Sequence, residues 1–257
     1  NAPCIPIRPI RVEFSEPVPK DLAMAVRLRG PDNKLYSPTE EKSAVDEDDT
    51  ANRRRVSFPF PLPESATFKL ELPKGLKDIS GRPLSNASSF PMTIQTSQAP
   101  PLAKFAAAPF GIVEWDPREP SLVPLTMRHV QPELQTGGPG KVLIKRVTDD
   151  LEVLNWFAKV RGVVLGEWES RDKPMLKGDR TAQPLELPKS DNPKAEMEVV
   201  GVPLRQPGYH VLEVASPRLG QSLLEPPGTM YVRTGVLVTN LGIHFKLGRD
   251  NSLAWVT

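Results

Sequence analysis

The residue types that most often do chemistry in proteins are scarce in this chain and far apart. It has three histidines, His129, His210 and His244, each in a strand-like run, and one cysteine, Cys4. A metal site needs clustered ligands, and the sequence has no H-x-x-H, H-E-x-x-H or C-x-x-C motif. A single cysteine also excludes an intrachain disulfide. We therefore predict no metal site, and histidines that are either satisfied within strands or turned to solvent.

Motifs for nucleophiles and for phosphate binding are missing as well. There is no G-x-S-x-G, and the glycine-rich residues 137–140 lack a following Lys-Ser or Lys-Thr. The acidic residues 46–49 lack the spacing of a calcium loop, so we expect a solvated loop there. Carboxylates are plentiful, and residue type alone does not exclude a glycosidase-like pair. The prediction is a non-enzymatic chain with no catalytic, cofactor-binding or metal-ligating residue and no cofactor.

Composition favours an all-β protein. The 257 residues are enough for two sandwich domains of roughly 100 residues each. Thirty prolines, distributed along the whole chain, argue against long helices because proline breaks helix interiors. The 33 basic and 31 acidic residues nearly balance, which gives no sign of a nucleic-acid partner. No stretch reaches the roughly 18 apolar residues that a transmembrane helix needs.

Short runs of alternating apolar and polar residues predict strands along most of the chain. These runs occupy residues 10–14, 56–60, 68–72, 90–94, 122–130, 141–147, 195–200, 209–215, 231–239, 241–247 and 252–257. Strands of this length and spacing are typical of antiparallel immunoglobulin-like sandwiches. The last two runs resemble a hairpin, which is marginal alone and needs a partner sheet. We expect residues 240–257 to begin a third, truncated sandwich domain.

Two segments depart from the strand pattern. Residues 97–104 contain two adjacent prolines and predict a stiff linker, where we place the first domain boundary. With the boundary before the terminal hairpin, the expected domains are 1–98, 99–239 and 240–257. Residues 149–159 predict one short helix, because Asp149 followed by Glu152 fits a capping box. The apolar residues assigned to its buried side are Leu151, Leu154, Phe157, Ala158 and Val160.

Two further details concern single positions. The arginine run at 53–55 predicts the start of a strand whose outer face is exposed to solvent. Tyr209 follows Pro207 and Gly208 at the entry to a strand, and two interpretations stay open for it. It is either a tyrosine corner, in which the phenol bonds nearby backbone, or a plain core residue.

The C-terminal part of the chain carries a family resemblance. Residues 230–246, Met-Tyr-Val-Arg-Thr-Gly-Val-Leu-Val-Thr-Asn-Leu-Gly-Ile-His-Phe-Lys, and Ser-Leu-Ala-Trp-Val-Thr at 252–257 resemble the junction between early macroglobulin-like domains of bacterial alpha-2-macroglobulin homologues. Residues 207–214 resemble the penultimate strand of such a domain, and residues 105–130 resemble its opening. Residues 10–18 resemble the immunoglobulin-like modules near the start of these proteins.

The resemblance implies tandem sandwiches: immunoglobulin-like at 1–98, macroglobulin-like with the helix at 99–239, and a third beginning at 240. It also implies a scaffold fragment of a large periplasmic, cell-envelope or secreted protein that traps proteases after a bait segment is cut. The implied partners are proteases, met through the full-length parent, and neighbouring domains of the same chain. The family's Cys-x-Glu-Gln thioester motif is absent, and Cys4 lacks a preceding Leu-x-Gly lipobox, so neither feature is carried over.

Two other functions stay open. An extracytoplasmic binding module, such as an adhesin or a carbohydrate-binding sandwich, would present two or more exposed tryptophans or tyrosines on one sheet face or loop tip. The four tryptophans are Trp115, Trp156, Trp168 and Trp255. An enzyme with a sandwich fold would instead place paired carboxylates in a cleft.

Overall fold

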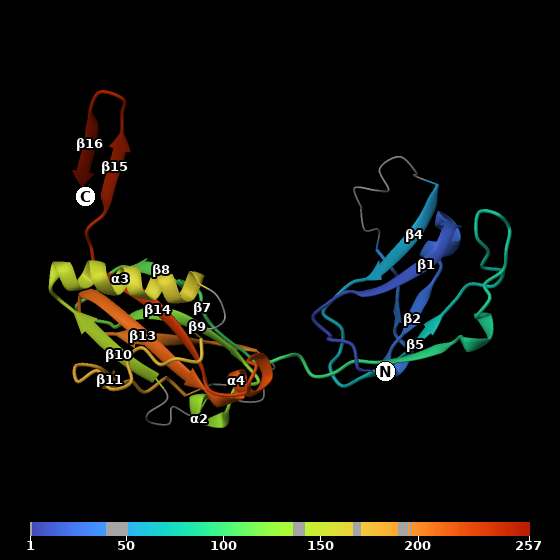
Figure 1. Cartoon of the computed structure of the whole chain (residues 1–257), viewed down its shortest axis with the longest axis horizontal. Coiled ribbons are helices and arrows are strands. Elements are labelled where there is room, and N and C mark those ends of the chain that lie inside the picture. The colour runs from blue at the N-terminus through green and yellow to red at the C-terminus, as the bar shows by residue number, and fades with distance from the viewer. Residues whose placement is uncertain (1, 40–50, 136–141, 167–170, 190–194, 196) are drawn as a thin grey trace. The chain divides into compact units, whose positions relative to one another are not determined.

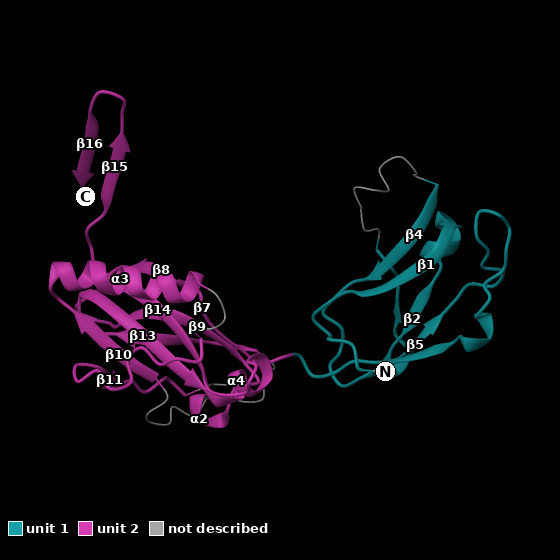
Figure 2. Ribbon diagram, viewed as in Figure 1, with its two compact units in different colours: residues 1–99 teal, residues 100–257 magenta. Residues whose placement is uncertain are grey.

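A computed structural model describes residues 2–39, 51–135, 142–166, 171–189, 195 and 197–257 (Figure 1). The chain forms two compact units, residues 1–99 and 100–257 (Figure 2). Both units consist mainly of β-strands in antiparallel sheets, with few helices, so the protein is all-β. Within the described ranges, no helix has the length and apolar character needed to cross a membrane.

Unit 1 contains two small antiparallel sheets. In the first, β1 (Ile10–Pro19) pairs with β4 (Asn52–Phe58). In the second, the strand order is β3 (Leu35–Tyr36), β2 (Arg27–Arg29), β5 (Thr67–Glu71) and β6 (Met92–Gln95). The helix α1 (Lys20–Met24) follows β1, and single 3₁₀ turns lie at Pro31–Asn33 and Ala87–Ser89.

The core of unit 1 is built from the apolar positions of these alternating strands. Its fully buried members include Leu28, Phe58 and Phe68, and Cys4 packs against it half-buried. The arginine run opens β4 as predicted, and Arg55 on its exposed side binds Glu13 of β1 at 2.7 Å. Apolar residues therefore build the inner face of β4, while charged residues near its start pair across the strands in solvent.

Unit 2 is built around a five-stranded and a three-stranded sheet. The larger sheet has the order β11 (Gln183–Pro184), β10 (Val142–Val147), β13 (Gly208–Ser216), β14 (Met230–Val238) and β8 (Phe110–Val113). The smaller has the order β12 (Glu198–Leu204), β9 (Ser121–Arg128) and β7 (Leu102–Phe105). The pairing of β14 with β8 is parallel, and the other strand pairs within these two sheets are antiparallel.

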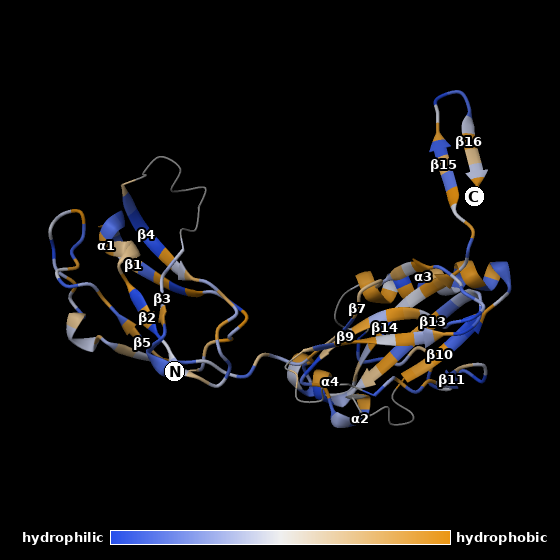
Figure 3. Ribbon diagram, turned by 180° about the vertical axis from the view of Figure 1, so that it is seen from behind, coloured by the Kyte–Doolittle hydropathy of each residue, from blue (hydrophilic) through white to orange (hydrophobic). Residues whose placement is uncertain are grey.

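Alternation along the central strand β13 explains how unit 2 is layered (Figure 3). Leu212 and Val214 point to one side and join the core shared with the three-stranded sheet. Tyr209 and Val211 point to the other side and pack with helix α3 (Asp150–Leu165). Because side chains alternate with a period of two, a strand with apolar residues on both faces lies between two layers.

Helix α3 confirms the predicted cap but corrects the predicted length and face. Asp149 caps it, since its carboxylate accepts the Glu152 N–H at 2.9 Å. The helix does not end near 159 but continues to Leu165, because Val160 and Val164 pack on the sheet and override the weak helix propensity of valine and glycine. The packed side comprises Val153, Trp156, Phe157, Val160 and Val164. Leu151 and Leu154, which we expected to be buried, are 73% and 63% exposed.

Two more predictions need correction. The chain has further short helices besides α1 and α3, namely α2 (Pro132–Gln135) and α4 (Pro217–Leu223). Ser216 caps α4 through the Leu219 N–H at 3.2 Å, so Ser-Pro is a helix-start signal that the strand interpretation overlooked. The predicted linker 97–104 does not stay a linker throughout, because β7 begins at Leu102 and buries Ala103.

The last two strands form a hairpin of their own. β15 (Ile243–Leu247) and β16 (Ser252–Val256) pair with each other, as the sequence predicted, and every residue in both strands is exposed. Gly242 and Thr257 close the open end of the hairpin with two backbone hydrogen bonds of 2.8 Å. That residues 240–257 begin a further domain stays a prediction.

Tyr209 is a plain core tyrosine. Its hydroxyl is buried and has no hydrogen-bond partner in the described part of the chain, so it makes no tyrosine corner. Burial raises the pKa of this phenol to about 12. The ring stacks on Phe110 with centroids 6.3 Å apart, and it lies over Gly235 of β14. A Cβ atom at Gly235 would come within 2.1 Å of the phenol oxygen, so the ring fits only above a glycine.

We expect Gly235→Ala to lower the free energy of unfolding by about 2 kcal/mol, because the new methyl group overpacks a site that cannot yield easily. Urea unfolding measures this. The control Gly162→Ala, in the last turn of α3 where the added methyl group meets open space, should instead add up to about 1 kcal/mol. Adding Tyr209→Phe to Gly235→Ala should recover part of the loss. Equal effects of the two alanine substitutions would contradict this account of the contact.

Candidate functional site

The most deeply buried ion pair of unit 2 lies on the face of the five-stranded sheet that α3 also covers. Glu213 of β13 and Arg233 of β14 are cross-strand neighbours, 2.7 Å apart, and each side chain is 2% exposed. The Glu213 carboxylate also accepts the N–H groups of Met175 and Leu176, at 2.7 and 3.1 Å. Arg233 donates to the carbonyl oxygen of Lys173. The pair therefore ties the segment 173–176 to the sheet.

Such a buried pair has a structural role. Removing two charges from water is costly, and the cost is offset only when the lone pairs and protons on both sides find partners. Here the carboxylate receives donors from one side chain and two backbone amides. A fully engaged pair that water cannot reach is not set up to exchange protons with a substrate.

A second polar cluster holds the next part of the same segment. Lys145 of β10 lies 3.0 Å from the Asp179 carboxylate and also donates to the Thr181 hydroxyl. The hydroxyl in turn donates to Asp179 at 2.7 Å. This hydrogen bond, with the Thr181 N–H and Lys145, lowers the pKa of Asp179 to about 2. Lys145 also lies 5.2 Å from the ring centre of Trp156, so strand, helix and loop meet at one ammonium group.

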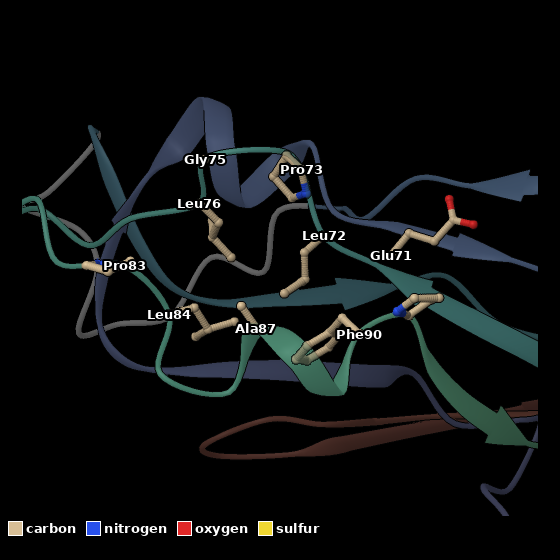
Figure 4. A pocket seen from close by; sticks show the side chains of 10 residues that line it. Glu71, Leu72, Pro73, Gly75, Leu76, Pro83, Leu84, Ala87 and Phe90 are labelled. Carbon is tan, nitrogen blue, oxygen red and sulfur yellow. The ribbon is translucent and has the colours of Figure 1, made fainter.

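Unit 1 has an apolar hollow beside the connection from β5 to β6 (Figure 4). It has a volume of about 570 Å³, and its lining includes Leu72, Leu76, Leu84 and Phe90. Glu71 lies at its rim and is held by two hydrogen bonds from Arg29, which lower the pKa of the Glu71 carboxyl. This hollow therefore presents apolar side chains to a ligand, and the Glu71 carboxylate at its rim is already paired with Arg29.

A neighbouring hollow of about 680 Å³ in unit 1 is lined by three carboxylates, each next to an arginine. The pairs are Glu13 with Arg55 at 2.7 Å, Glu16 with Arg54 at 3.6 Å, and Asp78 with Arg82 at 2.6 Å. A glycosidase-like pair needs one carboxyl held protonated and another left ionised. At Asp78, desolvation opposes ionisation, but hydrogen bonds from Arg82 and from the Ser80 N–H prevail and lower the pKa of the carboxyl.

Unit 2 has a basic hollow of about 460 Å³, lined by Arg146, Arg205 and His210 among others. His210 is only 3% exposed, and its Nε2 lies 2.8 Å from the carbonyl oxygen of Gln206. Its other ring nitrogen, Nδ1, is buried without a partner in the described part of the chain. Burial lowers the pKa of His210, the bond to Gln206 opposes that shift, and the charge of Arg146 adds to it.

The structure keeps the three histidines apart. His210 lies within β13, His244 lies exposed in β15, and His129 follows the end of β9 with a left-handed backbone (φ 49°) instead of lying in a strand. Among the described residues, no group of three or more His, Cys, Asp or Glu side chains is placed so that it could hold a metal ion. Sequence reasoning did not find the basic hollow, because Arg146 of β10 and Arg205 of the turn after β12 meet only through a sheet topology that the sequence does not reveal.

The tryptophans do not form a paired platform in the part of the chain that the structure describes. Trp115 and Trp156 are half-buried and pack against the two cores of unit 2. Trp255 is 45% exposed and stacks on His244 with centroids 4.9 Å apart. Trp168, the acidic residues 46–49 and the glycine-rich residues 137–140 lie outside the described residues.

The hairpin presents an uncovered apolar surface. Its register puts the side chains of Ile243, Phe245 and Leu247 on one face with those of Ala254 and Val256. The first three are 71%, 66% and 78% exposed. Five apolar side chains on one face of a two-stranded sheet make a surface that another sheet or chain could cover.

No protein-family model matches the chain, and a search of curated proteins finds no match. The geometry above therefore carries the functional argument, together with the resemblance noted in the sequence.

We expect Arg233→Met to lower the free energy of unfolding by about 3 kcal/mol, because it leaves the Glu213 carboxylate buried without its cationic partner. Urea unfolding measures the loss. Adding Glu213→Gln should recover part of it. Arg118→Met removes an arginine that is 85% exposed, so it should change the value by less than about 0.5 kcal/mol. A loss no larger than that of Arg118→Met would contradict the proposed role of the pair.

We expect stability to fall as the pH drops below about 6.5, because the folded chain lowers the pKa of His210 and the unfolded chain therefore takes up the proton first. The neutral His210 ring makes its full contribution to the free energy of unfolding at pH values above the pKa that it has in the unfolded chain. This contribution is lost as the pH falls towards the lower pKa that it has in the folded chain. Unfolding in urea between about pH 8 and pH 5.5 tests this. His210→Asn should flatten the dependence.

Proposed function

We propose that this chain is a non-enzymatic framework piece of an extracytoplasmic protein of the alpha-2-macroglobulin-like type. Its units would be tandem immunoglobulin-like and macroglobulin-type sandwiches, and its role would be to help trap proteases in the cell envelope. The resemblance of residues 205–257 to domain junctions of that family supports the proposal, and so does the all-β build of both units.

The observation that carries the proposal is the exposed hairpin. Ile243, Phe245 and Leu247 face solvent on a sheet of only two strands, which is marginal without a partner. In a series of stacked sandwiches, such a hairpin would supply the first strands of the next domain, and its apolar face would be buried there. The proposed occupant of this face is thus a neighbouring domain of the same protein.

The buried polar contacts of unit 2 are of the kind that a framework needs. Glu213 and Arg233 engage each other and the segment 173–176, and Lys145 engages Asp179. These contacts hold loops against the sheet. A domain held together in this way can move as a rigid body when the parent protein rearranges. Proteases would be met through another part of the parent protein.

The direct test uses the protein isolated from its native cells and treated with a protease that cuts it. Trapping predicts that migration on a native gel changes after cleavage. It also predicts that the protease stays bound and still cleaves a small peptide, but no longer a large protein substrate. Cleavage that changes neither migration nor the protease's access to large substrates would contradict the proposal.

Variants of the hairpin test the proposed junction. Phe245→Ser and Lys246→Ser should each change the free energy of unfolding of residues 1–257 by less than about 0.5 kcal/mol, because both side chains are exposed. In the protein isolated from its native cells, Phe245→Ser should increase proteolytic cleavage in the hairpin, and Lys246→Ser on the opposite face should not. Equal cleavage of the two variants would argue against a covered apolar face.

A further inference from the structure

The basic hollow of unit 2 lies where one edge of the larger sheet meets the end of a strand of the smaller sheet. Arg146 comes from β10, and Arg205 and Gln206 come from the turn that joins β12 to β13. Thr181 and Gln183 line it from the segment around β11. Apolar parts of the wall come from Ile144, Leu185 and Pro203.

Among the residues that the structure describes, the two arginines of this hollow have no acidic partner. Arg146 donates from Nε to the carbonyl oxygen of Pro207 at 2.9 Å, which holds the turn without neutralising its charge. The Arg205 side chain has no hydrogen bond or ion pair to any residue that the structure describes. In the described part of the chain, no Asp or Glu lines the hollow. Two cationic groups beside one hollow attract an anion, and guanidinium groups match the geometry of oxyanions.

His210 adds a third group that can carry positive charge. Its Nε2–H donates to Gln206, so in the neutral ring the buried Nδ1 is an acceptor without a partner. The charged groups that face it are Arg146 on β10 and Arg205 on the turn. The neighbour on β14 is Val236, which carries no charge. As far as the described residues go, the charged groups beside the imidazole are therefore both positive.

We propose that this hollow is a binding site for a small oxyanion, either a carboxylate or a phosphate-type group, held by Arg146 and Arg205. Thr181 and Gln183 supply polar side chains in the same wall. The buried His210 acts through its charge, without touching the ligand. The site rests on these residues alone and is independent of the proposed framework role.

Binding should be coupled to proton uptake. Without a bound anion, burial and the charge of Arg146 lower the pKa of the imidazole against the opposing effect of the bond to Gln206. A bound oxyanion cancels part of the arginine charge and makes protonation of His210 easier. By linkage, protonation then strengthens binding by the same factor. The affinity for an anion of constant charge should therefore rise as the pH falls from about 8 to about 6.

The test titrates the protein with sulfate or acetate at constant ionic strength, with chloride as the balancing salt. Nuclear magnetic resonance follows the His210 ring and the backbone amides of Arg205 and Gln206. Arg205→Gln should weaken binding about tenfold, the usual effect of losing one hydrogen bond to a charged group. Arg161→Gln removes an equal charge from the exposed side of α3, which packs on the opposite face of the larger sheet, and should leave binding unchanged.

The outcomes separate the alternatives. Saturable changes in chemical shift with sulfate alone indicate a phosphate-type ligand, and those with acetate alone indicate a carboxylate. Saturable changes with both probes indicate a general oxyanion site. If neither probe gives saturable changes in chemical shift, or if Arg205→Gln binds as tightly as the unmodified protein, the site is refuted.

His210→Asn should bind with nearly equal affinity at about pH 6 and pH 8. An affinity of the unmodified protein that does not rise on acidification would refute the coupling to His210.

Discussion

The pairing of β13 with β14 is the interaction on which unit 2 depends. Their register runs from Gly208 opposite Val238 to Ser216 opposite Met230 without a break. Each strand carries apolar side chains on both faces, so the pair separates the core shared with the smaller sheet from the core beneath α3. A shift of the register by one residue would exchange those faces and expose both cores. The parallel strand β8 and the strand β10 are added to the two sides of this pair.

The buried polar groups reinforce that register. Glu213 and Arg233 lie directly opposite each other, so the ion pair forms only when the strands are aligned as they are. A shifted alignment would leave two buried charges without partners, which costs far more than the pair contributes when formed. The contact of Tyr209 with Gly235 also favours this register, because any residue larger than glycine beneath the ring would collide with it. We infer that these contacts select one alignment more than they add stability.

Much of the strand framework could be predicted, because period-two alternation is a local property of the sequence. The cap of α3 was also predictable, since Asp149 and Glu152 are three residues apart. The end of α3 was not, because Val160 and Val164 stay helical through contacts with distant strands. The basic hollow was beyond sequence reasoning for the same reason: Arg146 and Arg205 are 59 positions apart and come together only through sheet topology.

The turn between β12 and β13 joins the basic hollow to the central strand pair. Arg146 holds this turn at Pro207, and His210 holds it at Gln206, so two side chains of the larger sheet fix the point where β13 begins. A change of charge in the hollow would therefore be felt first at the start of β13. That end of the strand also carries Tyr209, which packs on Phe110 of β8 and above Gly235 of β14. The hollow is thus placed where an anion could alter the stability of the sheet without reaching its core.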